Sequence, residues 1–173
     1  MGKTMGKRTR AVFDFLEIYL LTFIFFLLIM SVAVEVLFRY AFNHPIPELF
    51  EISIYTFIWA IYLGAALAKR YDQHIRFDLL YVKLSGKAKL WIDILFDTLT
   101  SLVFLILLVP TIQYTVINYK IKASVLRIPW TYLLMCFPIF VILILIHNGM
   151  AILSNIRELR GQGVPEKEIP PWL

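Results

Sequence analysis

Four long runs without a charged residue constrain the fold of this 173-residue chain more than any other feature. They cover residues 18–34, 52–68, 98–119 and 128–156. About 20 apolar residues are enough for an α-helix to cross the roughly 30 Å hydrocarbon core of a bilayer. A charge at the middle of such a helix costs about 2.5 to 3.5 kcal/mol, and none of the four runs carries one. The runs therefore predict four transmembrane helices.

The composition agrees with a chain whose solvent is mostly lipid. Hydrophobic residues make up 60% and charged residues only 17%, whereas soluble domains average about 45 to 50% and about 25%. A soluble domain this short would leave large apolar patches in water, so a water-soluble enzyme is not expected. The predicted fold is an all-α integral membrane protein in one domain over 1–173, with spans near 14–38, 48–68, 90–119 and 128–154 and a tail over 155–173.

The distribution of Lys and Arg predicts how the helices are oriented. Thirteen of the 17 lie in the N-terminal tail, the loop over 69–89 and the C-terminal tail, and four lie in the other two loops. Basic loops remain in the cytoplasm. Both termini and the 69–89 loop are therefore predicted to be cytoplasmic, while the loops over 38–48 and 120–127 face outward. The basic stretch before the first run also suits a signal peptide, but the run is long for one, so we expect a retained anchor.

The basic excess also bears on partners. A net charge of +5 in a soluble protein would suggest nucleic acid. In a membrane chain the expected acidic partner is phospholipid, and no nucleic acid is expected. The single cysteine, Cys136, allows no disulfide within the chain.

Two patterns concern helix packing. Ala60, Gly64 and Ala68 lie four apart on one face of the second helix, and such small residues allow another helix to approach closely. This face predicts a packed partner helix, from this chain or from another. Pro110 and Pro138 fall inside the third and fourth spans, where proline removes a backbone donor, so both helices are expected to bend.

Carboxylates stand near the ends of the first two helices, at Glu17, Glu35, Glu48 and Glu51. A carboxylate within a membrane is a functional candidate by default. All four can reach an interface, however, and Arg39 is available to Glu35 at a helical spacing of four or to a glutamate that opens the second helix. The pattern favours an interfacial ion pair.

The third and fourth helices carry further polar residues. Asp93 and Asp97 lie on one face at the start of the third helix. Two carboxylates there could form a cation site, but the favoured interpretation is that the dipole of the helix stabilises acidic residues in its first turns. His147 is the one histidine within a span, so haem held by two histidines of one chain is not expected. With Asn148, it is expected to hydrogen-bond a neighbouring helix. No phosphate loop, zinc spacing or nucleophile elbow occurs, so we expect neither a cofactor nor an enzyme.

The basic segment over 72–87 has two open interpretations. Charged residues fall in one sector of a helical projection with apolar residues around most of the rest, which suits a short helix on the membrane surface. Asp78 interrupts the apolar face. A solvated loop between the second and third helices is the equal alternative.

Residues 35–80 carry a more specific pattern. Its members are Arg39-Tyr40 after the first helix, Glu51 at the start of the second, Trp59, the Leu63-Gly64-Ala65-Ala66 turn, Lys69-Arg70, and His74-Ile75-Arg76 with Asp78. In this order and spacing the set resembles the small membrane subunit, DctQ-type, of tripartite ATP-independent periplasmic (TRAP) transporters. Elsewhere the length and the four-helix hydropathy agree with that family. One departure concerns the second helix, where Glu48 and Phe50 replace the family's tryptophan and first glutamate.

The resemblance implies a function. Such systems import organic acids in bacteria, using a periplasmic binding protein and a large membrane subunit that holds the substrate and sodium sites. The small subunit is implied to be a multi-pass protein of the inner membrane that acts as a scaffold for the large one. Sodium is expected in the partner subunit and not in this chain. We expect a structural or subunit-interface role for the residues of the family motif and of the small-residue face. They are Arg39, Tyr40, Glu51, Trp59, Ala60, Gly64, Ala68, His74, Arg76 and Asp78.

Two other classes remain open. A self-contained small exporter would work as a homodimer through a membrane carboxylate, for which Glu17 is the candidate. A membrane anchor subunit of a redox complex would bind haem. Transport by the purified chain alone would indicate the first, and a haem absorbance spectrum the second.

Overall fold

The computed structural model describes residues 13–71 and 86–161. Within these ranges the chain is helical, and its β-structure is limited to one isolated bridge between Lys122 and Pro129. The elements are η1 (Phe15–Tyr19), α2 (Leu20–Ala41), α3 (Pro47–Arg70), α5 (Gly86–Ile117), η2 (Asn118–Lys120), α6 (Thr131–Leu134) and α7 (Cys136–Leu159).

The prediction of four membrane-spanning helices is confirmed. Four helical segments of the described chain are long and apolar enough to cross a bilayer, and each agrees with one of the predicted spans. They are Glu17–Ala41, Pro47–Arg70, Gly86–Lys120 and Thr131–Leu159. The chain is therefore an all-α, multi-pass membrane protein.

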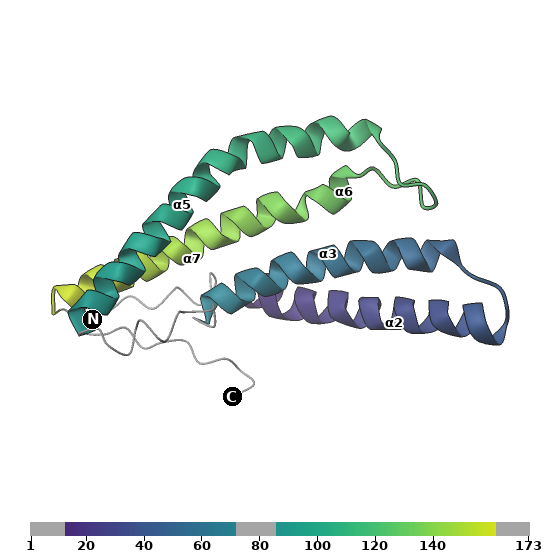
Figure 1. The fold of residues 1–173 in the computed structure, drawn as a ribbon, viewed down its shortest axis with the longest axis horizontal. Coiled ribbons are helices and arrows are strands. Elements are labelled where there is room, and N and C mark those ends of the chain that lie inside the picture. The colour runs from purple at the N-terminus through teal and green to yellow at the C-terminus, as the bar shows by residue number, and fades with distance from the viewer. Residues whose placement is uncertain (1–12, 72–85, 162–173) are drawn as a thin grey trace.

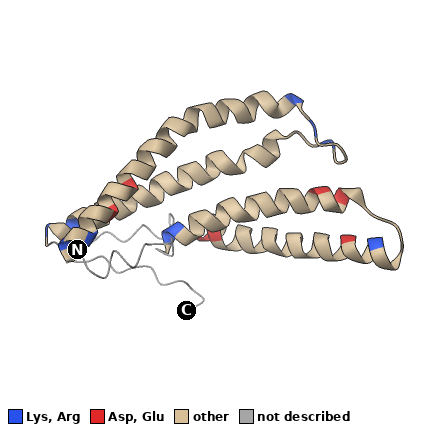
Figure 2. Ribbon diagram, viewed as in Figure 1, with Lys and Arg blue, Asp and Glu red and all other residues tan. Residues whose placement is uncertain are grey.

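The helices form two antiparallel pairs (Figure 1). Helix α2 packs on α3, α5 packs on α7, and the pairs meet where α3 contacts α7. We call this contact the α3–α7 interface. Because the helices alternate in direction, α2 begins and α3 ends at the same end of the molecule as the start of α5 and the end of α7. We call it the terminal end, and the opposite one the loop end. Charged residues gather toward the two ends and leave the middle of the helices uncharged (Figure 2).

The apolar core is small and lies around the α3–α7 interface. Buried side chains from α2, α3, α7 and the residues just before η1 form one cluster, which consists of Phe13, Ile24, Leu63, Ala66 and Leu143. The spans differ in how many residues of their most apolar 18-residue window are buried. The share is 39% in the fourth span, whereas no residue of the window is buried in the third. Helix α7 is therefore central, whereas α5 turns most of its apolar surface outward, as lipid or a protein partner requires.

The two prolines act differently on their helices. The ring of Pro138 would clash with the carbonyl four residues earlier, and α6 ends there, at Leu134, before α7 begins at Cys136. The sequence predicted a bend in this span, and the structure shows an interruption of the α-helix at Met135. Helix α5 continues through Pro110 and curves along its length (Figure 1).

The first span begins with a π-helical turn, η1, which the sequence did not predict. A π-helix contains one residue more per turn than an α-helix and occurs mostly as single turns. Glu17 stands in the middle of this turn and is fully buried. The turn thus places a carboxylate in the protein interior, at the start of a span most of whose later residues, in α2, are exposed.

The loop between α5 and α6 is held by its own backbone. The Ala123 N–H donates to the Ile128 carbonyl at 2.9 Å, and the Trp130 N–H donates to the Ile121 carbonyl at 2.9 Å. Arg127 closes this turn with a φ of 54°, in the left-handed region that non-glycine residues seldom occupy. The proposed surface helix over 72–87 falls almost entirely outside the described residues.

Candidate functional site

A buried ion pair and a histidine join three elements at the terminal end. The Glu17 carboxylate of η1 is completely shielded from solvent. Its Oε2 lies 3.2 Å from Nη1 of Arg70, the last residue of α3, and its Oε1 lies 2.5 Å from Nε2 of His147 on α7. Arg70 also donates through Nη2 to Oδ1 of Asp14 at 2.7 Å. Both oxygens of Glu17 are thus occupied by groups from two other helices.

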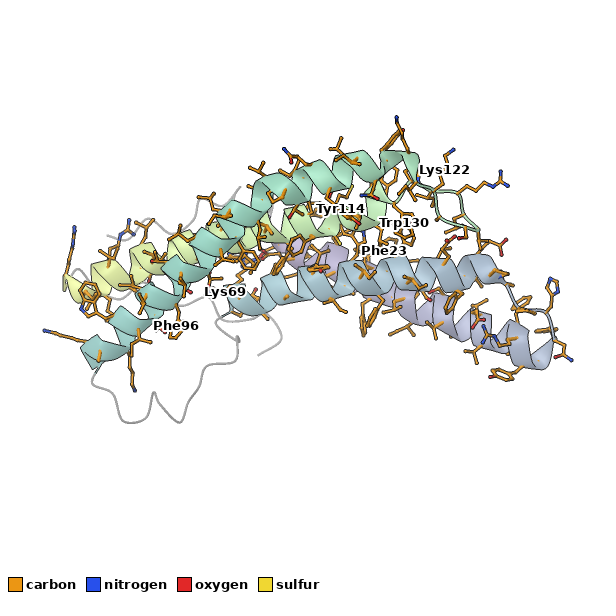
Figure 3. The ribbon with its side chains drawn as sticks, turned by 45° about the horizontal axis from the view of Figure 1, so that its top comes forward. Phe23, Lys69, Phe96, Tyr114, Lys122 and Trp130 are labelled. Atoms are coloured by element: carbon orange, nitrogen blue, oxygen red, sulfur yellow. The ribbon has the colours of Figure 1, made fainter. Side chains whose placement is uncertain are left out.

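A second group of contacts adds α5. Lys69 lies near the end of α3 (Figure 3). Its Nζ is 2.5 Å from Oδ1 of Asp97 on α5. Asn148 donates through Nδ2 to Oγ of Ser101 at 3.1 Å and to the Asp97 carbonyl at 3.4 Å. The Ser101 hydroxyl in turn donates to the Asp97 carbonyl at 2.6 Å.

We call these two groups together the buried polar cluster. Its members are Asp14, Glu17, Lys69, Arg70, Asp97, Ser101, His147 and Asn148. Charges removed from water are costly unless they are paired and hydrogen-bonded, and the cluster satisfies this condition with groups from η1, α3, α5 and α7. Such an arrangement can fix the relative position of helices. It leaves no carboxylate oxygen of Glu17 available to bind a substrate.

The structure tests the sequence predictions for these residues. His147 and Asn148 bond to neighbouring helices, as predicted. Asp97 forms an ion pair with Lys69. The sequence had favoured stabilisation of this carboxylate by the helix dipole alone. Glu17 forms an ion pair with Arg70, and the complete burial of its side chain was not predicted. One signal in the sequence could have indicated the Lys69–Asp97 and Arg70–Glu17 pairs. The two basic residues and the two carboxylates stand at the same predicted membrane depth.

At the loop end, polar contacts join α3 to the loop between α5 and α6 and to α6 itself. Oε2 of Glu51 accepts hydrogen bonds from the N–H groups of Leu126 at 2.6 Å and Val125 at 3.2 Å. The indole Nε1–H of Trp59 donates to the Tyr132 carbonyl at 3.0 Å. Two residues singled out from the sequence, Glu51 and Trp59, thus hold α3 to the segment that leads into α7.

Arg39 forms the ion pair with Glu35 that the helical spacing of four suggested. The Glu35 side chain is buried and that of Arg39 is half exposed. Tyr40 is largely exposed, and Glu48 is exposed as well. Of the glutamates near the second helix, Glu51 and not Glu48 has a contact within the described chain.

The small-residue face of α3 is open at Gly64. A Cβ added there would meet no atom within 4 Å, so no described helix covers it. Ala60 and Gly64 help to line an apolar groove of about 480 Å³ between α2 and α3, together with Phe25, Phe57 and Ile61. Ala68 is half-buried. A partner helix on this face stays a prediction, and it would belong to another chain or to residues outside the described ranges.

The remaining predictions concern metals and the basic segment. No group of three or more His, Cys, Asp or Glu side chains in the described ranges could hold a metal ion. His74, Arg76 and Asp78 lie outside the described residues.

Comparison with known proteins gives two matches. The family model described as "Tripartite ATP-independent periplasmic transporters, DctQ component" matches residues 28–158. A protein of Haemophilus influenzae, provisionally named a TRAP transporter small permease protein, is 45% identical over 60 residues. That alignment covers 34% of this chain and 37% of the relative. The chain therefore matches less than half of the relative's length.

Proposed function

Because the chain belongs to the family of DctQ components of TRAP transporters, a family of transport components, we propose that it is the small permease subunit of such a transporter. In this proposal it resides in the bacterial inner membrane and assembles with a large membrane subunit and a periplasmic substrate-binding protein. The transporter imports an organic acid with sodium, and both bind to the other subunits.

We propose further that this chain acts as a scaffold. The observation that carries the proposal is that polar contacts join the two helix pairs at both ends of the α3–α7 interface. The Arg70 contacts with Glu17 and, through Glu17, with His147 lie at the terminal end, and the Glu51 and Trp59 contacts lie at the loop end. Helices held at both ends resist relative displacement, as a fixed support for a moving transport domain requires.

The distribution of apolar surface supports the same role. In the most apolar window of the first and of the second span 11% of the residues are buried, and in that of the third no residue is fully buried within the chain. Large exposed side chains follow α2 and α5 along their lengths, among them Phe23, Phe26, Leu105 and Ile106. Such faces suit contact with lipid and with the helices of a larger membrane partner.

Reconstitution tests the proposal. The full chain alone in proteoliposomes is expected to give no uptake. Addition of the large permease, the binding protein and an inward sodium gradient is expected to give uptake of the acid that the binding protein carries. Transport by this chain alone would show a self-contained exporter, which the complete burial of Glu17 and the occupation of both its oxygens argue against. A haem spectrum in the purified chain would show a redox anchor.

A second experiment separates a scaffold from a substrate-binding subunit. Arg70→Met removes the central cation of the buried polar cluster, and Arg157→Ala, an exposed arginine on α7, is its control. A scaffold variant is expected to lower the amount of assembled transporter and the maximal uptake rate while KM is unchanged. A raised KM at normal assembly would place the residue in substrate binding and would contradict the scaffold role.

A further inference from the structure

Three basic side chains gather where α5 leads into α6. Lys120 ends η2, Lys122 and Arg127 belong to the loop, and all three are exposed. The C-terminal end of α5 and the loop after it are blue and carry no red (Figure 2), because the sequence has no Asp or Glu between residues 98 and 157. None of the three takes part in an ion pair within the described ranges. We call these three residues the basic turn.

The other charges of the loop end leave the basic turn without a counterion. All its carboxylates lie on α2 and α3, at Glu35, Glu48 and Glu51. Glu35 is paired with Arg39. Oε2 of Glu51 accepts two backbone N–H groups of the loop, and Glu48 is exposed in the first turn of α3. His44, in the α2–α3 loop, can add only positive charge.

The backbone that carries the basic turn is held in one conformation. Lys122 forms an isolated antiparallel bridge with Pro129, and Arg127 has a φ of 54°. The Ile121 N–H donates to the Asn118 carbonyl at 3.1 Å, and the Asn118 side chain donates through Nδ2 to the carbonyl four residues earlier at 2.7 Å. Groups that are ordered before binding lose less entropy when a ligand arrives.

Apolar and aromatic side chains surround the three cations. The exposed ones next to them in the sequence are Tyr119, Ile121, Val125 and Trp130, and Trp130 stands at the loop end with Lys122 (Figure 3). Aromatic residues at the ends of membrane spans lie at the depth of the lipid headgroups. Lys and Arg place apolar stems along such a surface and extend their charge toward water. Protein interfaces, in contrast, are depleted in lysine, so the surroundings favour lipid over an acidic protein.

We propose that the basic turn binds the headgroup of an anionic phospholipid in the leaflet at the loop end. The Arg127 guanidinium can bind two phosphate oxygens at once, and the two lysines act as point charges. The lipid fixes the membrane depth of the segment between α5 and α6, which Glu51 in turn joins to α3. This site does not depend on the proposed transport function.

Photocrosslinking of the full chain in detergent micelles tests the proposal. The probe is phosphatidylglycerol with a photoreactive group in its headgroup, and mass spectrometry locates its adducts. Adducts are expected within residues 119–130, and unlabelled phosphatidylglycerol should suppress them, whereas phosphatidylcholine and inorganic phosphate should not. Absence of adducts from this segment would overturn the proposal and leave an acidic protein as the partner. Equal suppression by phosphatidylcholine, or suppression by inorganic phosphate, would overturn the assignment to an anionic lipid.

A neutralised variant tests the three side chains together. It combines Lys120→Gln, Lys122→Gln and Arg127→Asn, and asparagine is chosen because it tolerates a positive φ. The concentration of unlabelled phosphatidylglycerol that halves the adduct yield should rise at least about fivefold, since one cation near an anionic surface changes affinity by about that factor. A variant with Lys120→Arg, Lys122→Arg and Arg127→Lys keeps the charges and should keep the affinity.

The matched control removes three exposed cations at the terminal end, with Lys87→Gln, Arg157→Gln and Arg160→Gln. Its adducts within residues 119–130 should be unchanged. An equal loss in the control would assign the effect to net charge and would contradict the proposal, as would unchanged affinity in the neutralised variant. The thermal unfolding midpoint in lipid-free detergent shows whether each variant folds. The single variant Lys122→Gln, also expected to lose about fivefold, replaces the neutralised variant if that one does not fold.

Discussion

Glu17 and Arg70 stand 53 residues apart in the chain and form an ion pair that is almost completely shielded from solvent. The pair joins the first turn of the first span to the last residue of the second. Because Glu17 also contacts His147, the same carboxylate connects both helix pairs. At the terminal end these polar atoms therefore join the two pairs beside the small apolar core.

Arg70→Met is expected to be strongly destabilising. It removes the cation but leaves Glu17 and Asp14 in place, and loss of one partner of a buried ion pair costs about 3 to 5 kcal/mol. Thermal unfolding of the purified chain in detergent measures the effect.

The double variant Arg70→Met with Glu17→Gln separates this mechanism from lost packing. If the cost comes from the unpaired carboxylate, the double variant should recover part of the lost stability. The matched control is Arg157→Ala, whose side chain is exposed and whose effect should be within about 0.5 kcal/mol. Equal losses in the single and double variants would contradict the role of the unpaired charge.

Glu51→Ala is expected to release the loop between α5 and α6. The Glu51 carboxylate accepts hydrogen bonds from the N–H groups of Val125 and Leu126, and a hydrogen bond to a charged group contributes about 1.5 to 3 kcal/mol. Hydrogen exchange of residues 123–128 should become faster. Glu48→Ala, one turn earlier on the same helix and exposed, should leave the exchange unchanged. Equal exchange in the two variants would show that Glu51 does not hold the loop.

Much of the fold could be predicted from the sequence because it depends on local composition. The four spans follow from charge-free runs, and the pairing of Glu35 with Arg39 follows from helical spacing alone. The break before Pro138 follows from the steric requirement of the proline ring. Each of these features is determined by residues close together in the chain.

The buried polar cluster could not be predicted in the same way. Its burial of Glu17 depends on the π-helical turn at Phe15–Tyr19, and no residue pattern in FLEIY indicates such a turn. The pairing of Lys69 with Asp97 depends on the lateral order of the helices, in which α7 lies between α3 and α5 near this contact. Hydropathy specifies which helices cross the membrane but not which ones are neighbours.

Trp59→Phe is expected to weaken the α3–α7 interface at the loop end. Phenylalanine keeps an aromatic ring but cannot donate to the Tyr132 carbonyl, and one hydrogen bond of this kind contributes about 0.5 to 1.5 kcal/mol. The unfolding midpoint should decrease. The control is Trp91→Phe, because Trp91 is exposed and makes no hydrogen bond among the described contacts. A decrease of the same size in the control would assign the effect to tryptophan packing in lipid or detergent.

Substitutions at Gly64 test whether its open face receives another chain. A Cβ at this position meets nothing within 4 Å, and alanine favours a helix over glycine by about 1 kcal/mol. The isolated chain should therefore tolerate both Gly64→Ala and Gly64→Leu without loss of thermal stability. If a partner helix packs closely on this face, Gly64→Leu should reduce copurification of the large permease, and Gly64→Ala should reduce it less, because the obstruction grows with side-chain size. Full recovery of the permease with Gly64→Leu would show that this face meets lipid.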